Sequence, residues 1–312
     1  MKNPNYILVT PARDEGKYIE ETIRSVAHQT ILPQRWTIVS DGSTDRTEAI
    51  IAEYQQKHSF IHLLRREPDP TRNFASKAYA IALGVANCAQ VPYEYVGLMD
   101  ADVSFTTCFF EKVLNRMELR PQLGIGGAAV YEQVSGRWTM LKASYNTSVG
   151  GQMQMFKRAC YEAIGGYQAL PMGGLDMVAE TMVRMRGWDV KAFTDLQLFH
   201  HRVVGTAERS RLQAAFRRGR MEHANGYALL FQMLRFFTQL AVRPYVLGSL
   251  FRTAGYAWEY ARREPLVVPE EFALFLRTQQ MNRIKALLKI GQTQRTGSDA
   301  STWEWTPKEA IK

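Results

Sequence analysis

The strongest constraint on the fold is a short apolar run, residues 95–99, that ends in the pair Asp100 and Asp102. The run Tyr-Val-Gly-Leu-Met is short and bounded, which predicts a buried strand rather than a helix. Carboxylates at the carboxyl end of a buried strand lie where open α/β sheets bind ligands. Two unpaired carboxylates repel each other, and a hard divalent cation such as Mg²⁺ removes the repulsion because it takes oxygen ligands. An ordinary Asp-rich turn is the plainer alternative, since D-x-D alone is a common sequence.

Strands and helices alternate along the chain around this run. Apolar, β-branched runs predict strands, and apolar residues at helical spacing predict helices. Short connections between them favour right-handed βαβ units and a mostly parallel sheet. Neither G-x-G-x-x-G nor G-x-x-x-x-G-K-[ST] is present, which argues against a common dinucleotide fold and excludes a P-loop NTPase. The predicted strands are 6–10, 36–40, 60–64, 95–99, 123–130, 188–193 and 196–199, and the predicted helices include 45–57, 73–90, 106–119 and 177–186.

Three local patterns add expectations about packing. Asp45 and Glu48 have the spacing of a capping box at the start of a helix. The glycines at 124, 126 and 127 indicate a strand that another backbone or a ligand approaches closely. The Met-rich segment 149–164 is more typical of a hydrophobic core than of a binding surface.

Charge and cysteine usage limit the partners and the compartment. The net charge of +9 and pI ≈ 9.4 suit phosphate-bearing ligands or anionic lipid, although simple solvation explains part of the charge. No recognisable module accompanies the basic residues, so we expect no nucleic-acid partner. Three cysteines are few and odd in number, which favours reduced thiols and a cytoplasmic protein. We expect neither a signal peptide nor a membrane-spanning helix, because no apolar window is long enough.

Three motifs follow one another along the chain: V-T-P-A-R-D-E at 9–15, V-S-D-G-S-T-D at 39–45 and L-M-D-A-D at 98–102. Together they resemble the family 2 glycosyltransferases of the GT-A fold, over roughly residues 5–205. The resemblance implies a site for a nucleotide-sugar donor and a divalent metal, Mn²⁺ or Mg²⁺. Residues 77–84 resemble the family's K-A-x-A-L-N-x-G helix, with Ala82 in place of Asn. By position, the implied donor-site residues are Pro11, Arg13, Glu15, Asp41, Lys77, Asp100, Ala101 and Asp102.

A fourth motif, Gly173-Gly174-Leu175-Asp176, resembles the acceptor-side G-G-E-D of the same family. Asp176 matches the general base of inverting members, and Leu175 replaces the usual Glu. Glu180 lies one helical turn later on the same face and is the second candidate for the base or for orienting the acceptor. The alternative is that Asp176 only caps the helix that follows.

The last predicted strand ends in His200-His201-Arg202. In many enzymes of the GT-A fold a histidine after the last strand binds the metal or the diphosphate. We expect His201 to be the metal ligand together with Asp102, while His200 remains an alternative, and we assign Arg202 to substrate binding. Lone histidines are usually structural, but imidazole is an acceptable ligand for Mn²⁺ or Mg²⁺.

The C-terminal third combines arginines with apolar helices. Residues 209–220 predict a basic amphipathic helix, whose candidate partners are donor phosphates, a lipid-linked pyrophosphate or anionic lipid. Residues 227–260, broken at Pro244, suit helices that lie on the catalytic domain, on a partner or in a membrane interface. A last helix is expected at 271–290. The family's processivity motif Q-x-x-R-W is absent, which predicts single sugar addition.

These observations predict an α/β, GT-A-like, mostly parallel sheet flanked by helices, with a helical C-terminal extension. The expected division is a catalytic domain at 1–205, a helical region at 206–290 and a flexible tail at 291–312. The resemblance implies a metal-dependent inverting glycosyltransferase that uses a UDP-sugar and a glycan or lipid-linked acceptor, in cell-envelope or exopolysaccharide synthesis. We expect a cytoplasmic protein, and peripheral contact with the inner face of the membrane is a further option. A non-catalytic nucleotide-sugar binder and a haloacid-dehalogenase-like phosphotransferase are the alternatives.

Overall fold

The computed structural model describes residues 4–67, 74–134, 136–141, 148–202, 210–240 and 245–293, with side chains up to residue 286. The loop after Arg202, the start of the expected basic helix at Arg209, Pro244 and the tail beyond residue 293 lie outside the described residues.

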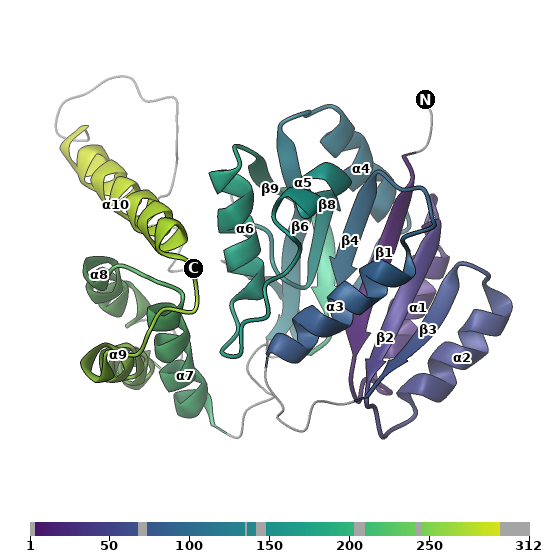
Figure 1. Cartoon of the computed structure of the whole chain (residues 1–312), viewed down its shortest axis with the longest axis horizontal. Coiled ribbons are helices and arrows are strands. Elements are labelled where there is room, and N and C mark those ends of the chain that lie inside the picture. The colour runs from purple at the N-terminus through teal and green to yellow at the C-terminus, as the bar shows by residue number, and fades with distance from the viewer. Residues whose placement is uncertain are drawn as a thin grey trace.

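A mixed β-sheet forms the centre of the molecule (Figure 1). Its strands run in the order β3-β2-β1-β4-β8-β6-β9-β5, and β7 pairs with β6. The first four positions are parallel, as the βαβ alternation predicts, whereas β8 is antiparallel to both of its neighbours. The expected α/β class is therefore confirmed. The strands are β1 (Tyr6–Ala12), β2 (Arg35–Asp41), β3 (Ile61–Arg66), β4 (Tyr95–Met99), β5 (Val103–Phe105), β6 (Leu123–Val134), β7 (Arg137–Met140), β8 (Met153–Lys157) and β9 (Asp189–His200).

Helices cover both faces of the sheet, because alternate residues of the buried strands point to opposite sides. Tyr6 and Leu8 pack against α1 and α4, whereas Ile7 and Val9 pack on the other side with α3, α5 and α6. The parallel strands thus read as continuous apolar runs, as strands buried on two faces do. The helices of this part are α1 (Ile19–Ala27), α2 (Thr47–Lys57), α3 (Ala75–Asn87), α4 (Phe109–Glu118), α5 (Arg158–Ala163) and α6 (Leu175–Met185).

Two expectations about local structure are wrong. The predicted strands 188–193 and 196–199 form one strand, β9, whose pairing with β6 shifts register between Phe193 and Gln197. The capping box does not form, because Glu48 accepts a hydrogen bond from Ser40 Oγ (2.7 Å) instead of reaching back to residue 45. Asp45 still accepts from the Thr47 backbone N–H (2.9 Å), and α2 begins only at Thr47.

Two expectations about packing are confirmed. A Cβ on Gly127 would lie 2.1 Å from Val149 Cγ1 and 3.1 Å from the Met153 carbonyl oxygen, so β6 is approached closely there. Met153 and Met155 are buried in the core beneath the sheet surface. These contacts bring the segment 149–153 against β6 at Gly127.

The C-terminal helices are α7 (Arg211–Ala224), α8 (Leu229–Gln239), α9 (Tyr245–Arg262) and α10 (Glu270–Thr293). Helices α7 and α9 cross at two glycines. A Cβ on Gly219 would lie 1.8 Å from the Arg252 carbonyl oxygen, and one on Gly255 would lie 2.0 Å from the Phe216 carbonyl oxygen. A separate apolar cluster joins α10 to α6 through Val178, Phe272 and neighbours. The helical region therefore packs directly on the sheet domain.

The expected basic helix forms as α7, but part of its charge is turned inward. Arg220 pairs with Glu259 of α9, and Glu222 of α7 pairs with the buried Arg252. Within the described residues, no helix combines the length and the apolar composition that a bilayer crossing requires.

We expect Gly219→Ala to destabilise the protein by about 1–3 kcal/mol, because the added methyl meets a backbone carbonyl that cannot rotate away. In an open helix the same change would stabilise by about 0.5–1 kcal/mol. Urea unfolding monitored by circular dichroism measures the difference. Gln213→Ala is the control, since Gln213 is an exposed position on the same helix and is not at the crossing. Unchanged or increased stability of the Gly219 variant would show that the crossing is loose.

Candidate functional site

Asp100 and Asp102 follow the carboxyl end of β4, and positively charged groups from distant segments neutralise them. Lys77 of α3 places its Nζ 2.5 Å from Asp100 Oδ1. His200 Nε2 and Arg202 Nε lie 3.4 and 3.3 Å from the Asp102 carboxylate. Burial raises the pKa of Asp102, but His200, Arg202 and Lys77 outweigh it and hold that pKa below its ordinary value. The sequence-predicted residues at 77, 100, 102 and 202 thus meet in one place.

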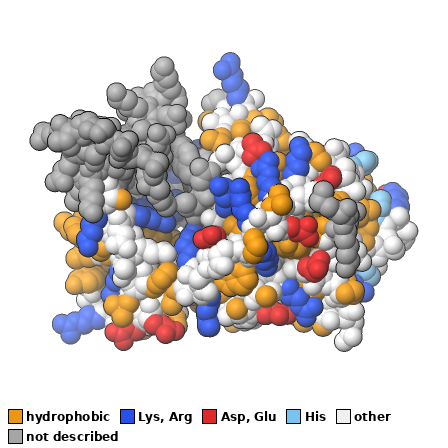
Figure 2. Space-filling model, turned by 90° about the horizontal axis from the view of Figure 1, so that it is seen from above, with side chains coloured by type: hydrophobic (Ala, Val, Ile, Leu, Met, Phe, Trp, Pro, Cys, Tyr) orange, Lys and Arg blue, Asp and Glu red, His pale blue; other side chains and the backbone are white. Residues whose placement is uncertain are grey.

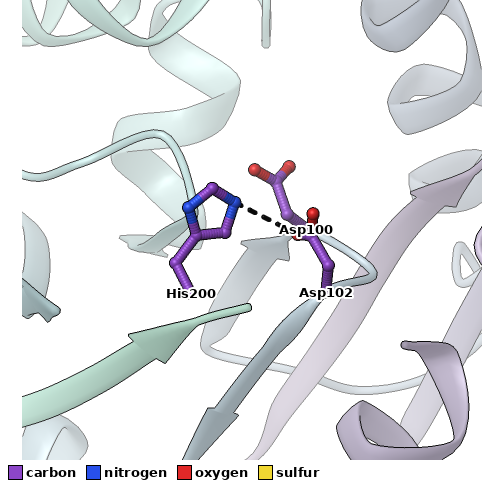
Figure 3. A group of neighbouring side chains, drawn as sticks. All are labelled: Asp100, Asp102 and His200. Carbon is purple, nitrogen blue, oxygen red and sulfur yellow. Dashed lines mark ion pairs between the residues drawn. The ribbon is translucent and has the colours of Figure 1, made fainter. Parts of the chain in front are cut away.

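Asp100, Asp102 and His200 form a group that can hold a metal ion (Figure 3). One ligand atom from each lies within 4.8 Å of the other two. Two carboxylates and an imidazole fit Mn²⁺ or Mg²⁺. His201 is not in this group, because its Nε2 lies 2.8 Å from Ser104 Oγ. The geometry therefore favours His200 over the sequence-based choice of His201.

Glu132 holds the His200 ring in place from the neighbouring strand. The two residues are paired in register between β6 and β9, and His200 Nδ1 lies 2.8 Å from Glu132 Oε1. Burial lowers the pKa of His200, but the hydrogen bonds to Asp102 and Glu132 raise it to about 9. Sequence reasoning missed Glu132, although a buried carboxylate on an otherwise apolar strand is a usable signal.

The loop after β1 contributes Arg13 and Glu15 to the same edge of the sheet. Glu15 pairs with Arg202, and burial together with the nearby Asp102 carboxylate raises the pKa of Glu15 to about 7. The Nε of Arg13 is buried and has no hydrogen-bond partner among the described residues. Pro11 is partly buried at the end of β1.

Two other donor-site candidates are already engaged within the protein. Asp41, at the end of β2, forms an ion pair with Arg66 of β3. Ala101 packs its methyl group into the core, and its carbonyl accepts a hydrogen bond from Thr22 Oγ1 (2.8 Å). Neither the side chain nor the carbonyl of Ala101 points toward Asp100, Asp102 and His200.

Asp176 stands at the second position of α6, beside the turn of residues 150–152. Gly174 occupies the N-cap position and no side chain caps the helix, so the alternative that Asp176 is only a cap is wrong. A Cβ on Gly151 would lie 2.9 Å from Asp176 Oδ2, and the next residue, Gln152, accepts a hydrogen bond from the Asp100 backbone N–H (2.9 Å). The same short turn therefore contacts both acidic centres.

Glu180 is buried beneath this turn rather than open to a ligand. Its Oε1 accepts from the Val149 backbone N–H (2.6 Å), and Ser148 Oγ and Arg184 also contact the carboxylate. Burial raises the pKa of Glu180 to about 7. Leu175, which stands where the motif usually has Glu, is buried in the core beside α3 and α5. These contacts favour a positioning role for Glu180.

Helix α7 reaches the loop before Asp176, a contact that the sequence did not reveal. Arg217 donates to the Met172 carbonyl (3.1 Å) and lies 4.4 Å from the centre of the exposed Phe74 ring. Asn225 Nδ2 donates to the Gly173 carbonyl (3.3 Å). The loop that precedes α6 is thus held from both α3 and α7.

Comparison with known proteins agrees with this arrangement. The family described as glycosyl transferase family 2 matches residues 7–170, more than half of the chain. The matched segment contains the donor-side candidates up to Asp102 but ends before Asp176, Glu180 and His200.

Two relatives from Bacillus subtilis (strain 168) are similar over part of their length. The uncharacterized glycosyltransferase EpsJ is 25% identical over 136 residues, 44% of this chain and 37% of its own. The putative teichuronic acid biosynthesis glycosyltransferase TuaG is 30% identical over 115 residues, 36% of this chain and 42% of its own. The similarity thus spans about two fifths of these relatives.

Solved structures share the fold. The mannosyltransferase PcManGT of Pyrobaculum calidifontis, solved with GDP-Man and Mn²⁺, gives a TM-score of 0.55 at 17% identity and covers 93% of this chain and 81% of its own. Residues 1–349 of S. aureus TarS with UDP-GlcNAc give 0.52 at 14% identity, covering 87% and 78%. At these identities the likeness establishes the fold alone, and with it the expected GT-A-like class.

We expect Glu180→Gln to gain stability relative to the parent protein as the pH rises from 5 to 7. The folded protein keeps the Glu180 proton up to about pH 7, whereas the unfolded chain loses it near 4.5. Folding therefore loses up to roughly 3 kcal/mol across this window, and glutamine removes the loss while still accepting from Val149. Urea unfolding at pH 5, 6 and 7 measures it.

The control is Glu162→Gln, an exposed glutamate on α5 that pays no burial penalty. A constant stability difference between the Glu180 variant and the parent at all three pH values would contradict the assignment of a buried, protonated carboxyl.

Proposed function

The chain belongs to glycosyl transferase family 2, and we propose that it transfers a sugar from a nucleoside diphosphate sugar to a hydroxyl of a glycan or lipid-linked acceptor, with inversion. One observation carries the proposal: Asp100, Asp102 and His200 converge at the carboxyl end of β4, within reach of Lys77 and Arg202. Such a mixture of carboxylates and cations suits a diphosphate that arrives with a metal ion.

The donor diphosphate would lie against the cations of this edge. Lys77 and Arg202 form ion pairs with Asp100 and Asp102 and can exchange those partners for phosphate oxygens. The unpaired Nε of Arg13 offers a further donor. Asp41 and Arg66 stand at the end of the neighbouring strands, where we place the base or ribose. UDP is our choice of nucleotide, because the family resemblance implies it, and GDP, with whose sugar conjugate PcManGT is solved, is the alternative.

We assign the metal site to Asp100, Asp102 and His200 rather than to the pair Asp102 and His201 that the sequence favours. A bound Mn²⁺ or Mg²⁺ would neutralise negative charge on the diphosphate as it leaves. Glu132 fixes the orientation of the His200 imidazole through Nδ1 and so leaves Nε2 directed at Asp102.

We assign the general base to Asp176. It accepts the proton of the acceptor hydroxyl while that oxygen bonds to the anomeric carbon and the bond from that carbon to the diphosphate breaks. The turn at 150–152 separates Asp176 from Asp100, which leaves the two acidic centres on either side of one short segment. Glu180 positions that segment through Val149.

The names of the relatives support a class of acceptor, and the free cysteines support a cytoplasmic location. EpsJ and TuaG carry glycosyltransferase names, and the latter is assigned to teichuronic acid biosynthesis, which supports a role in polysaccharide or cell-envelope assembly. We place the reaction in the cytoplasm, where the three free cysteines, Cys88, Cys108 and Cys160, stay reduced.

We expect UDP to bind in the presence of Mn²⁺ and to bind at least about tenfold more weakly in EDTA, because the diphosphate then faces the Asp100 and Asp102 carboxylates without a cation. Asp102→Asn should cause a similar loss. Isothermal titration calorimetry with UDP and GDP, each with Mn²⁺ and with EDTA, measures both effects.

Asp195→Asn is the matched control, since Asp195 is exposed and pairs with Arg116 away from the site. Preference for GDP would keep the mechanism and change the donor class. Binding of neither nucleotide would refute the transferase proposal.

We expect Asp176→Asn to lower turnover by about 10²–10⁴-fold, because an amide cannot take the acceptor proton. Affinity for Mn²⁺ and UDP should stay unchanged, since Asp176 lies across the turn from the metal group. Nucleoside diphosphate release measures turnover. Unchanged turnover would remove Asp176 as the base and reopen the alternative of a protein that binds nucleotide sugars without catalysis.

A further inference from the structure

Helices α8 and α9 present a continuous apolar surface, which we call the apolar face. It comprises their exposed hydrophobic side chains, such as Met233 and Phe237 on α8 and Leu247, Leu250 and Trp258 on α9, which are 47–65% exposed. No charged side chain of the described residues 229–240 and 245–261 is exposed. Figure 2 shows hydrophobic side chains at the left-hand end of the molecule, which the C-terminal helices occupy in Figure 1.

Apart from the exposed Arg262 at the end of α9, the charged residues of these helices point the opposite way, into the protein. Arg252 of α9 is buried and forms two hydrogen bonds with Glu222 of α7. Arg235 of α8 lies 3.0 Å from the same carboxylate. Glu259 is buried and pairs with Arg220. Polar groups inside and apolar groups outside reverse the usual order of a helix in water.

This reversed arrangement suits helices that are surrounded by lipid. Acyl chains accept the apolar face, while the ion pairs remain enclosed by protein, where their partners are. Helix α8 has 11 residues and α9 has 18, and neither meets the requirements for crossing a bilayer. Helices of this kind lie in the plane of the interface with one face in the hydrocarbon. Tyr245 and Trp258, near the two ends of α9, are the amphipathic aromatic residues that favour this depth.

The charge of the region identifies the kind of surface. Residues 210–286 contain twelve Lys and Arg but only five Asp and Glu, a net charge of +7. Arg262, the last residue of α9, and Arg263, directly after it, are exposed at the edge of the apolar face. Anionic headgroups attract such residues. A second copy of the same chain would bring another +7 against this edge, and like charges oppose that contact.

We propose that the apolar face of α8 and α9 docks this protein on a bilayer that contains anionic lipid, with both helices in the plane of the interface. Binding rests on these helices alone and stands whether or not the transfer reaction proposed above is correct.

The test is flotation of the purified full chain with vesicles of phosphatidylglycerol and phosphatidylcholine. We expect the protein to float with mixed vesicles and to bind phosphatidylcholine alone more weakly. The double variant Met233→Glu, Leu247→Glu should lose at least about tenfold in partitioning, because each change places a charge in hydrocarbon. Both side chains are 55% exposed, so the variant keeps its core.

The matched control is Leu119→Glu, which changes an apolar residue that is 82% exposed after the end of α4 and should leave partitioning unchanged. Circular dichroism and urea unfolding verify that each variant is folded. A second measurement uses brominated lipid, which should quench the fluorescence of Trp258, and the quenching should decrease in Trp258→Phe.

Absence of flotation at low salt, or flotation that the double variant retains, would overturn the proposal. A dimer detected by light scattering that the double variant abolishes, without flotation of the parent protein, would assign the apolar face to a second copy instead.

Discussion

Two carboxylates one residue apart, at the end of a buried strand, need positive charge close by, and much of this structure serves to supply it. Lys77 comes from a helix that precedes β4, whereas His200 and Arg202 come from about a hundred residues later. The sheet order brings them together, because β9 lies between β6 and β5, and its last residue, His200, pairs with Val103, directly after Asp102. Loss of these cations would leave the carboxylates to repel each other in a partly buried place. The metal ion that we propose for this site would join a charge balance that the protein already maintains.

The sequence predicted those parts of the site that depend on neighbouring residues in the chain, such as the end of a strand or the start of a helix. Asp41 and Asp100 each follow an apolar run, and Asp176 begins a periodic helix after two glycines, so strand ends and helix starts were readable. The choice between His200 and His201 was not. Successive side chains of a strand point to opposite faces, and the register shift before Gln197 decides which of the two points at Asp102. No sequence period encodes such a shift.

Contacts between distant segments account for the other omissions. Glu132 depends on a partner 68 residues away, and Arg217 on a loop 45 residues away. Glu180 lies one turn after Asp176 on α6, as the spacing predicts, but its burial depends on residues 148–149, which contact its carboxylate. In the C-terminal region, the sequence indicates a basic amphipathic helix and apolar helices that contain arginines. It does not indicate whether the apolar or the charged side chains of these helices face outward. The Glu222 and Arg252 pair, enclosed between α7 and α9, reverses the arrangement that composition suggests for a protein in water.

The glycine crossing of α7 and α9 has a consequence for reach. Gly219 and Gly255 allow the two backbones to touch, so the helices cannot slide or tilt without a clash of carbonyl groups. The far side of α7 holds the loop before Asp176 through Arg217 and Asn225. If α9 rests in a bilayer, this stack of helix, helix and loop acts as a spacer of constant height. The distance from the lipid surface to Asp176 would then be fixed by the protein. Only a lipid-linked acceptor whose glycan is long enough to bring its hydroxyl to that height could react, so the enzyme would select acceptors by glycan length.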